Sequence, residues 1–120
     1  MRFGEDIYFC RKEKGIETFS APEKITLKPN YFSLQPSKSS TDIMIYGKDI
    51  DKISIAYAPI DVWGADKFKV GDRFYIDYAK PTDDEEYGEN ANAEIISVNF
   101  QNLFINIKIR KIVINQEEGY

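Results

Sequence analysis

The C-terminal part of the chain, residues 91–114, carries the longest alternation of apolar and polar positions. The apolar positions are Leu103, Ile105, Ile107 and Ile109, and the polar positions between them include Asn106, Lys108 and Arg110. A two-residue period of this length is typical of a strand with one buried face. With Val98 and Phe100 before it, the segment predicts a long β-hairpin.

The register of this hairpin depends on its turn, for which Gln101 and Asn102 are the candidate residues. A two-residue turn there places Phe100 opposite Leu103, Val98 opposite Ile105 and Ile96 opposite Ile107, so all the apolar side chains share one face. Asn102 tolerates positive φ better than Gln101, so a bulged or longer turn stays open. Lys111 breaks the alternation, which indicates a bulge or a change of sheet partner.

The remainder of the chain shows short strands separated by turn residues. We expect strands at residues 7–10 and 16–19, joined by a charged loop, and at residues 25–28, 31–36, 43–47, 53–57 and 73–78. Pro36 cannot donate to a ladder, so residues 31–36 are expected at a sheet edge. Only residues 60–67 are expected to hold a helical turn. The pattern predicts an all-β fold, a small β-barrel or sandwich with long loops, in one domain over residues 1–120.

Two alternating segments and one tryptophan stand out in the middle of the chain. In residues 53–57, Ile53, Ile55 and Tyr57 would share one face, with Ser54 and Ala56 on the other. In residues 73–78, Phe74, Ile76 and Tyr78 would share a face after a tight turn at Gly71. Trp63, the only tryptophan, is expected to anchor a loop on the core because of its large apolar area.

Composition removes several classes of chemistry. The chain has no histidine, which excludes Ser-His-Asp and Cys-His catalysis and His-ligated zinc, so an enzyme would depend on carboxylates, Lys or Tyr. The single cysteine, Cys10, cannot form an internal disulfide and is expected to be a small buried side chain. We therefore expect a protein that is not an enzyme and has no cofactor.

Charge and apolar run lengths bear on location and partners. The net charge of −4 argues against an extended phosphate-binding surface. No apolar run approaches the ~18 residues that a membrane span needs, and the start of the chain does not resemble a secretory signal. The protein is expected to be made in the cytoplasm and to have no membrane partner.

An acidic stretch within residues 80–92 is the first candidate site. Its residues are Asp83, Asp84, Glu85, Glu86, Tyr87 and Glu89. Such a segment cannot bury itself, and it is expected to project into solvent, towards a partner or into a channel. Calcium binding is an alternative, but the spacing does not match a dedicated calcium loop, so no metal is expected. A catalytic carboxylate pair would require burial that adjacent loop acids lack.

The predicted edge strand and the polar segment after it form the second candidate site. The residues expected there, at an interface edge or loop, are Tyr31, Phe32, Leu34, Ser37, Lys38 and Thr41. Residues 37–42 are polar and are expected to form a mobile loop. An exposed strand edge offers unpaired backbone groups to another chain.

Nucleic-acid binding on an OB-like barrel is a further alternative. The chain has eight Tyr and eight Phe, which can stack on bases. Such surfaces combine aromatic rings with a positive groove, whereas the basic cluster here is limited to Arg11, Lys12 and Lys14.

Several segments in order resemble one known group of proteins. They are residues 31–36 (YFSLQP), 41–42 (TD), 46–47 (YG), 68–77 (FKVGDRFYID), 87–93 (YGENANA) and 101–103 (QNL). Over most of the chain they resemble small virion proteins of long-tailed phages of Gram-positive bacteria, of the head-closure or head-to-tail connector stopper type. Related tail-completion and minor capsid proteins have a similar size and strand content.

The resemblance implies a β-barrel subunit that assembles as a ring of about six or twelve copies in the virion. The ring would join the portal and adaptor complex to the tail and help to retain DNA, which passes through its channel. A monomer in isolation stays open, because ring formation can require the preceding ring as a template. By this resemblance, residues 80–92 or residues 37–42 would face the channel or a partner.

Overall fold

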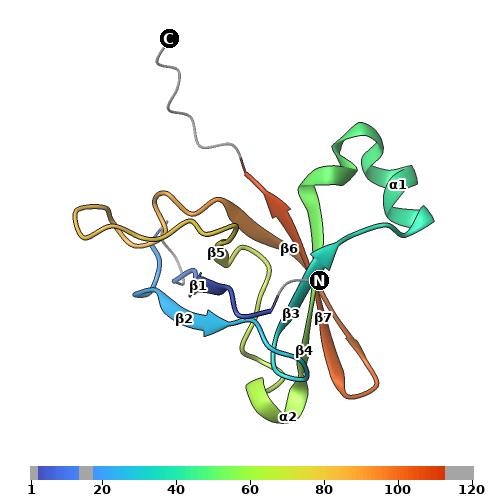
Figure 1. Cartoon of the computed structure of the whole chain (residues 1–120), viewed down its shortest axis with the longest axis horizontal. Coiled ribbons are helices and arrows are strands. Elements are labelled where there is room, and N and C mark those ends of the chain that lie inside the picture. Colours follow the sequence, from blue (N-terminus) through green and yellow to red (C-terminus); the bar gives the residue numbers. More distant parts are fainter. Residues whose placement is uncertain (1–2, 14–17, 113–120) are drawn as a thin grey trace.

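In the computed structural model of the protein, residues 3–13 and 18–112 are described, and within them seven strands form one antiparallel sheet (Figure 1). The strands are β1 (Asp6–Cys10), β2 (Glu23–Thr26), β3 (Ser33–Pro36), β4 (Ile53–Pro59), β5 (Arg73–Tyr75), β6 (Ala93–Gln101) and β7 (Phe104–Lys111). The helices are α1 (Ser40–Tyr46), a 3₁₀ helix η1 (Gly47–Lys52) and α2 (Ile60–Trp63). The strand order across the sheet is β2-β1-β5-β6-β7-β4-β3.

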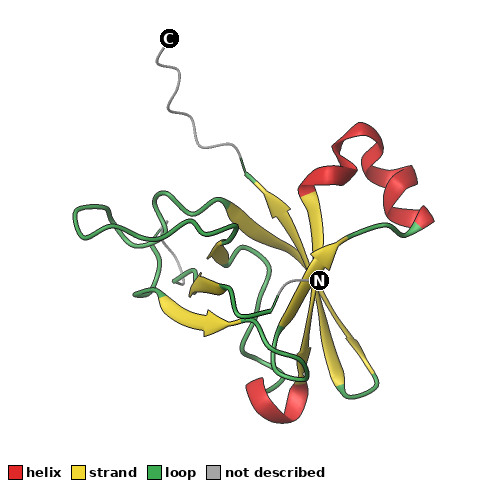
Figure 2. Ribbon diagram, in the orientation of Figure 1, coloured by secondary structure: helices red, strands yellow, loops and turns green. Residues whose placement is uncertain are grey.

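The sheet curves into a half-barrel whose two edge strands approach each other at one end. There, Lys28 and Phe32 pair through two backbone hydrogen bonds of 3.1 and 3.2 Å, just before β3 begins. The helices lie at the periphery (Figure 2). The prediction of an all-β, barrel-like fold is confirmed, and β3 lies at an edge, as expected from Pro36.

The β6–β7 hairpin occupies the centre of the sheet, but its register differs by two residues from the predicted one. Phe100 faces Ile105, Val98 faces Ile107, and Asn102 and Leu103 form the turn. Asn102 has a φ of 56°, which asparagine tolerates better than glutamine. Because the shift is even, the apolar residues of β7 still share one face.

The hairpin also contains a bulge that the alternation did not predict at that place. The ladder shifts between Ile95 and Ser97, so Ile95 faces Ile109 and Ile96 has no cross-strand partner. The predicted pairing of Ile96 with Ile107 is therefore wrong. The break that was expected at Lys111 is absent from β7, which pairs with β6 as far as Lys111. The irregularity is the bulge on β6.

The core contains an aromatic cluster, packed among the aliphatic side chains of the inner face of the sheet. Phe9, Phe32, Phe68 and Phe74 are buried, with ring centroids 5.1–6.2 Å apart in the contacting pairs. Trp63 packs against Phe32 and Phe68, and its Nε1 donates a 2.7 Å hydrogen bond to the Tyr31 carbonyl. The tryptophan thus anchors the α2 segment on the core, as predicted.

The core face of β4 is the one that carries its two alanines. Ala56 and Ala58 lie in the core cluster, whereas Ile55 and Tyr57 are half-buried on the outer face. The two alanines face the bulky side chains of β7, and Ala56 pairs with Ile107. Small residues next to large ones fill this layer, so the apolar content of a position alone does not identify the core face.

The strand predicted at residues 73–78 ends early, at Tyr75. Asp77 and Tyr78 both have positive φ, and the Tyr78 side chain is exposed rather than in the core. In place of a neighbouring strand, the Asn92 side-chain amide pairs with the Ile76 backbone, accepting from its N–H at 2.8 Å and donating to its carbonyl at 2.9 Å. This side chain ends the ladder while leaving the backbone satisfied.

The N-terminal hairpin differs from the prediction where it is described, because β1 pairs with β2 and β5, whereas residues 18–20 pair with residues 11–13 of the expected loop. After β1, Lys12 bridges to Phe19, and the Ser20 N–H donates to the Arg11 carbonyl at 2.8 Å. Residues 14–17 and 113–114 lie outside the described residues, so the predicted strand at 16–19 and the end of the hairpin at 114 are described only in part. Cys10 is fully buried, as expected.

The aromatic cluster makes a prediction about stability. Phe32→Ala would remove a ring that contacts three aromatic neighbours in the core, Trp63, Phe68 and Phe74, and should lower the free energy of unfolding by about 3–5 kcal/mol. Phe100→Ala, at a half-exposed position, serves as the matched control and should cost less than about 1.5 kcal/mol. Urea unfolding of both variants measures the difference, and equal losses would contradict this description of the core.

Candidate interaction surfaces

The acidic loop, residues 80–92, projects from the sheet on the side away from α1 (Figure 1). Five of its six candidate residues, Asp83, Asp84, Glu86, Tyr87 and Glu89, are exposed. Glu85 is the exception, because its side chain turns inward and accepts hydrogen bonds from Tyr75, Thr82 and Asn90. The surface that the loop presents therefore lacks one of the predicted carboxylates.

The contact between Glu85 and Tyr75 shifts the pKa of both side chains. Burial opposes ionisation of Glu85, but hydrogen bonds from Tyr75, Thr82 and Asn90 outweigh it and lower the pKa of this carboxyl. For Tyr75, burial and the hydrogen bond to Glu85 both raise the pKa of the phenol. Glu85 is therefore an ionised structural acceptor that fixes the base of the loop.

The other side of the loop is tied to the N-terminal hairpin. Arg73 donates to the Gly88 carbonyl at 3.2 Å, and its guanidinium lies 4.8 Å from the centre of the Phe19 ring. Gly88 has a φ of +78°, and a Cβ there would lie 2.8 Å from Phe19. Only glycine fits this close approach.

Exposed carboxylates in the loop do not converge. Among residues 3–13 and 18–112, no group of three or more Asp, Glu or Cys side chains is arranged to hold a metal ion. The loop is an acidic surface held at its base by Glu85 and Gly88, and it contains no converging set of ligands.

The second candidate set separates into buried and exposed residues. Phe32 and Leu34 are fully buried in the core, and Ser37 is also buried. Tyr31 is half-buried, while Lys38 and Thr41 are exposed. At this edge the backbone of β3 is the part that faces outward, because β3 pairs with β4 on one side only.

The segment that follows β3 is a helix, which corrects the predicted mobile loop at 37–42 and strand at 43–47. Helix α1 begins after Ser39, whose Oγ accepts from the Asp42 N–H at 3.0 Å. It ends at Gly47, which has a positive φ. The signal was present in the sequence, because Ser39 followed three residues later by an acid is a helix N-terminal pattern.

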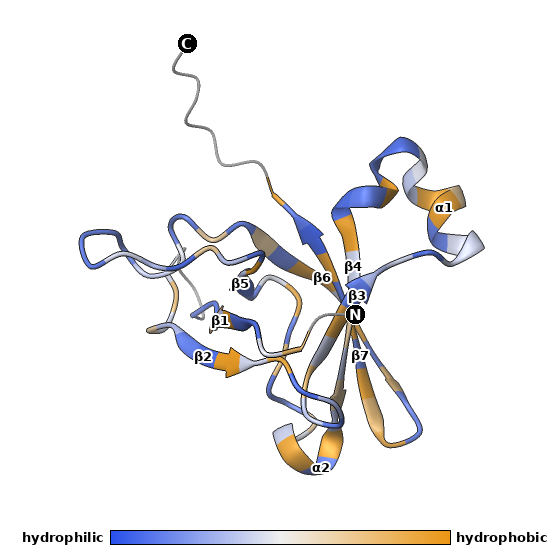
Figure 3. Cartoon of the chain, in the orientation of Figure 1, coloured by the Kyte–Doolittle hydropathy of each residue, from blue (hydrophilic) through white to orange (hydrophobic). Residues whose placement is uncertain are grey.

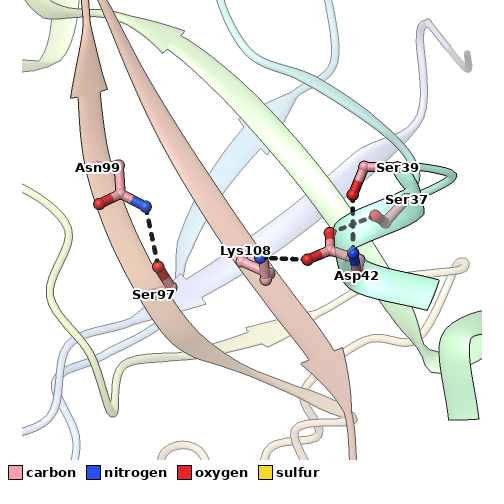
Figure 4. A network of polar contacts seen from close by, with 6 residues as sticks. All are labelled: Ser37, Ser39, Asp42, Ser97, Asn99 and Lys108. Carbon is pink, nitrogen blue, oxygen red and sulfur yellow. Dashed lines mark hydrogen bonds and ion pairs between the residues drawn. The ribbon is translucent and has the colours of Figure 1, made fainter. Parts of the chain in front are cut away.

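Asp42 fixes α1 to the sheet through a polar network (Figure 4). Its carboxylate accepts from Ser37 Oγ at 2.5 Å and from Lys108 Nζ at 2.6 Å. Lys108 lies on the outer face of β7, and Asp42 is only 2% exposed. The ion pair joins residues 66 positions apart in the sequence.

The network keeps Asp42 ionised. Hydrogen bonds from Lys108 and Ser37 lower the pKa of this carboxyl, against the opposing effect of burial. The ionised Asp42 therefore adds to the free energy of unfolding at pH values above the ordinary carboxyl pKa of about 3.9. This contribution is lost as the pH falls through the lower pKa that Asp42 has in the folded protein. Alternation alone could not predict the pair, because it identifies Lys108 only as facing away from the core.

A polar hollow of about 250 Å³ lies next to the network, on the outer face of the sheet. Its lining consists of Ser39, Thr41, Asp42, Ile55, Tyr57, Asn99, Asn106, Ile107 and Lys108. Asn99 and Asn106 are cross-strand neighbours. The side-chain amide of Asn99 donates to Ser97, and that of Asn106 donates to Gln101. The hollow separates α1 from the tip of the β6–β7 hairpin.

Two apolar surfaces are exposed on projecting elements. The α1 surface consists of Ile43, Met44 and Ile45, and the hairpin-tip surface consists of Phe100, Leu103 and Phe104, with Phe100 and Phe104 on opposite sides of the tip. Figure 3 shows apolar colouring on α1 although this helix lies outside the core. Sequence reasoning assigned these residues to strand faces and did not identify either surface.

Comparisons of the chain with protein-family models, with curated proteins and with solved structures found no match. In the described part of the chain, no helix has the length and apolar character needed to cross a membrane.

The network around Asp42 gives a testable pH dependence. In a double-mutant cycle of Asp42→Asn and Lys108→Met, the coupling free energy at pH 7 should be about 1–3 kcal/mol, as for hydrogen bonds to charged groups. The coupling should shrink as the pH falls below about 4 and Asp42 becomes protonated. Urea unfolding at several pH values measures it, and a coupling that is independent of pH would contradict the assignment.

The contact between Gly88 and Phe19 gives a second prediction. Gly88→Ala should destabilise the protein by about 2–4 kcal/mol, from the positive φ together with overpacking against the ring. In a Phe19→Ala background only the backbone part, about 1–2 kcal/mol, should remain. Thermal unfolding of the four proteins measures both costs, and an identical cost in the two backgrounds would show that the ring does not matter.

Proposed function

We propose that this protein is a structural, ring-forming subunit of a phage virion that joins the portal and adaptor complex to the tail. In this proposal it acts by docking and self-assembly and catalyses no reaction. The head-closure, or stopper, role is the specific form we favour, with a tail-completion or minor capsid role as the alternative.

The observation that carries the proposal is the presence of two exposed apolar surfaces on elements that project from a small half-barrel. The Met44 side chain is 84% exposed and the Leu103 side chain is 75% exposed. Apolar clusters that project from small domains usually mark surfaces covered by a partner. The unpaired edge of β3 offers a third contact, through backbone hydrogen bonds to another subunit.

The acidic loop supports the same proposal from the opposite side of the fold. Its exposed carboxylates would repel the phosphates of DNA, so a channel lined by them would allow DNA to pass without binding. The charge is held in place because Glu85 and Gly88 fix the base of the loop. An OB-like nucleic-acid-binding role would instead need a basic groove beside exposed aromatic rings.

Electron microscopy tests the proposal directly. The protein would be mixed with the portal and adaptor proteins of the same phage or prophage, over several salt concentrations. A ring that caps the adaptor complex is the expected result, and its position would separate the stopper role from the tail-completion role. The absence of any association, with tail proteins also tested, would overturn the proposal.

A further inference from the structure

Residues 38–52 connect β3 to β4 and form an arm that projects from the sheet (Figure 1). The arm contains α1 and η1, and all of its residues are described. Among them, Asp42 is the only buried residue. The apolar side chains of Ile43, Met44 and Ile45 are exposed, so they add little to the attachment of the arm.

Both ends of the arm are fixed by the sheet. Pro36 pairs with Ser54, and beside this pair the Ser37 N–H donates a 3.0 Å hydrogen bond to the carbonyl of Ile53, which is fully buried. The β3–β4 ladder therefore closes the base of the arm. Closing a flexible loop costs only slightly more as the loop lengthens, so this ladder does not need an ordered arm.

Between these ends, the contacts that join the arm to the sheet converge on Lys108 of β7 (Figure 4). Lys108 Nζ donates to the Asp42 carboxylate at 2.6 Å and lies 5.8 Å from the centre of the Tyr46 ring. Among residues 3–13 and 18–112, these are the side-chain hydrogen bonds, ion pairs and ring contacts from the arm to another strand. Ser37, which also donates to Asp42, lies at the base of the arm.

Loss of the Lys108 charge would release the arm. A carboxylate that is buried without its partner is costly, whereas opening a segment with one buried residue exposes little apolar surface. Helix α1 has seven residues, and isolated helices shorter than ~12–15 residues are marginal in water. A released arm would therefore lose its helix instead of moving as a rigid body.

We infer that the arm is a separately opening unit, held closed by Lys108, that unfolds locally while the half-barrel stays folded. Segments with few buried apolar contacts open at a lower free energy than the whole domain. Ser39, Thr41 and Asp42 form one wall of the polar hollow, and Tyr57 and Lys108 belong to its sheet side. The arm is thus a lid over this hollow, and one ion pair controls access to it. This opening takes place within one copy and does not depend on assembly.

Hydrogen exchange of the wild-type protein, followed by NMR, tests the separate opening without any substitution. The α1 amides, such as that of Gly47, which donates to the Ile43 carbonyl, should have protection factors at least about tenfold lower than the amides of β4 and β7. Their exchange should also depend less on urea, because opening of the arm exposes less surface than global unfolding. Equal protection and equal urea dependence in the arm and in these strands would overturn the inference.

Two matched substitutions on β7 test the role of Lys108. Lys108→Met should raise the exchange rates of the arm amides by about tenfold or more, the factor expected for a lost hydrogen bond to a charged group. Arg110 lies on the same face of β7, but its 2.9 Å ion pair is with Glu94 of β6. Arg110→Met should therefore change the exchange of the arm by less than about twofold. Equal effects of the two variants would contradict the assignment of Lys108.

Trypsin provides a second measurement of the same opening. Lys48 and Lys52 lie in the arm and are exposed. Cleavage after them should be about tenfold faster in Lys108→Met than in the wild type or Arg110→Met, because proteolysis follows the population of the open form. The two fragments should stay together in size-exclusion chromatography, held by the β3–β4 ladder. Fragments that separate, or a Lys108→Met protein that is unfolded throughout, would overturn the inference, because the half-barrel would then depend on the closed arm.

Discussion

The two-residue period of β7 is the constraint on which the rest of the structure depends. Ile105, Ile107 and Ile109 must face the core, so Lys108 between them must face outward. The same strand therefore supports two layers, an aromatic core on one side and a polar network with α1 on the other. Without Lys108, the carboxylate of Asp42 would be buried without its charged partner, at a cost of several kcal/mol.

Much of the fold was predictable because alternation and proline positions are local signals. The β6–β7 hairpin, the edge position of β3 and the anchoring role of Trp63 were expected from the sequence and are present. The register of the hairpin was not, because the choice between Gln101–Asn102 and Asn102–Leu103 as the turn changes no apolar face. A shift of two residues preserves the pattern on which the prediction depended.

The candidate surfaces were less predictable because they depend on contacts between distant residues. Asp42 and Lys108 meet only after β4 and β7 have paired, and no local pattern links them. Helix α1 was missed because its apolar residues are consecutive, which resembles a buried strand, although its N-terminal signal at Ser39 was present. The acidic loop was located correctly, but the inward orientation of Glu85 depends on Tyr75, ten residues earlier.

The order of the strands has a consequence for synthesis on the ribosome. The strand order places β6 and β7 between two groups, β2-β1-β5 and β4-β3, which do not pair with each other in the ladders of the sheet. Until the central β6–β7 hairpin has been translated, β5 and β4 each lack the neighbouring strand with which they pair in the folded sheet. The nascent chain thus passes through a stage in which aggregation-prone strand edges are open, and the two groups join cooperatively once residues 93–111 leave the exit tunnel.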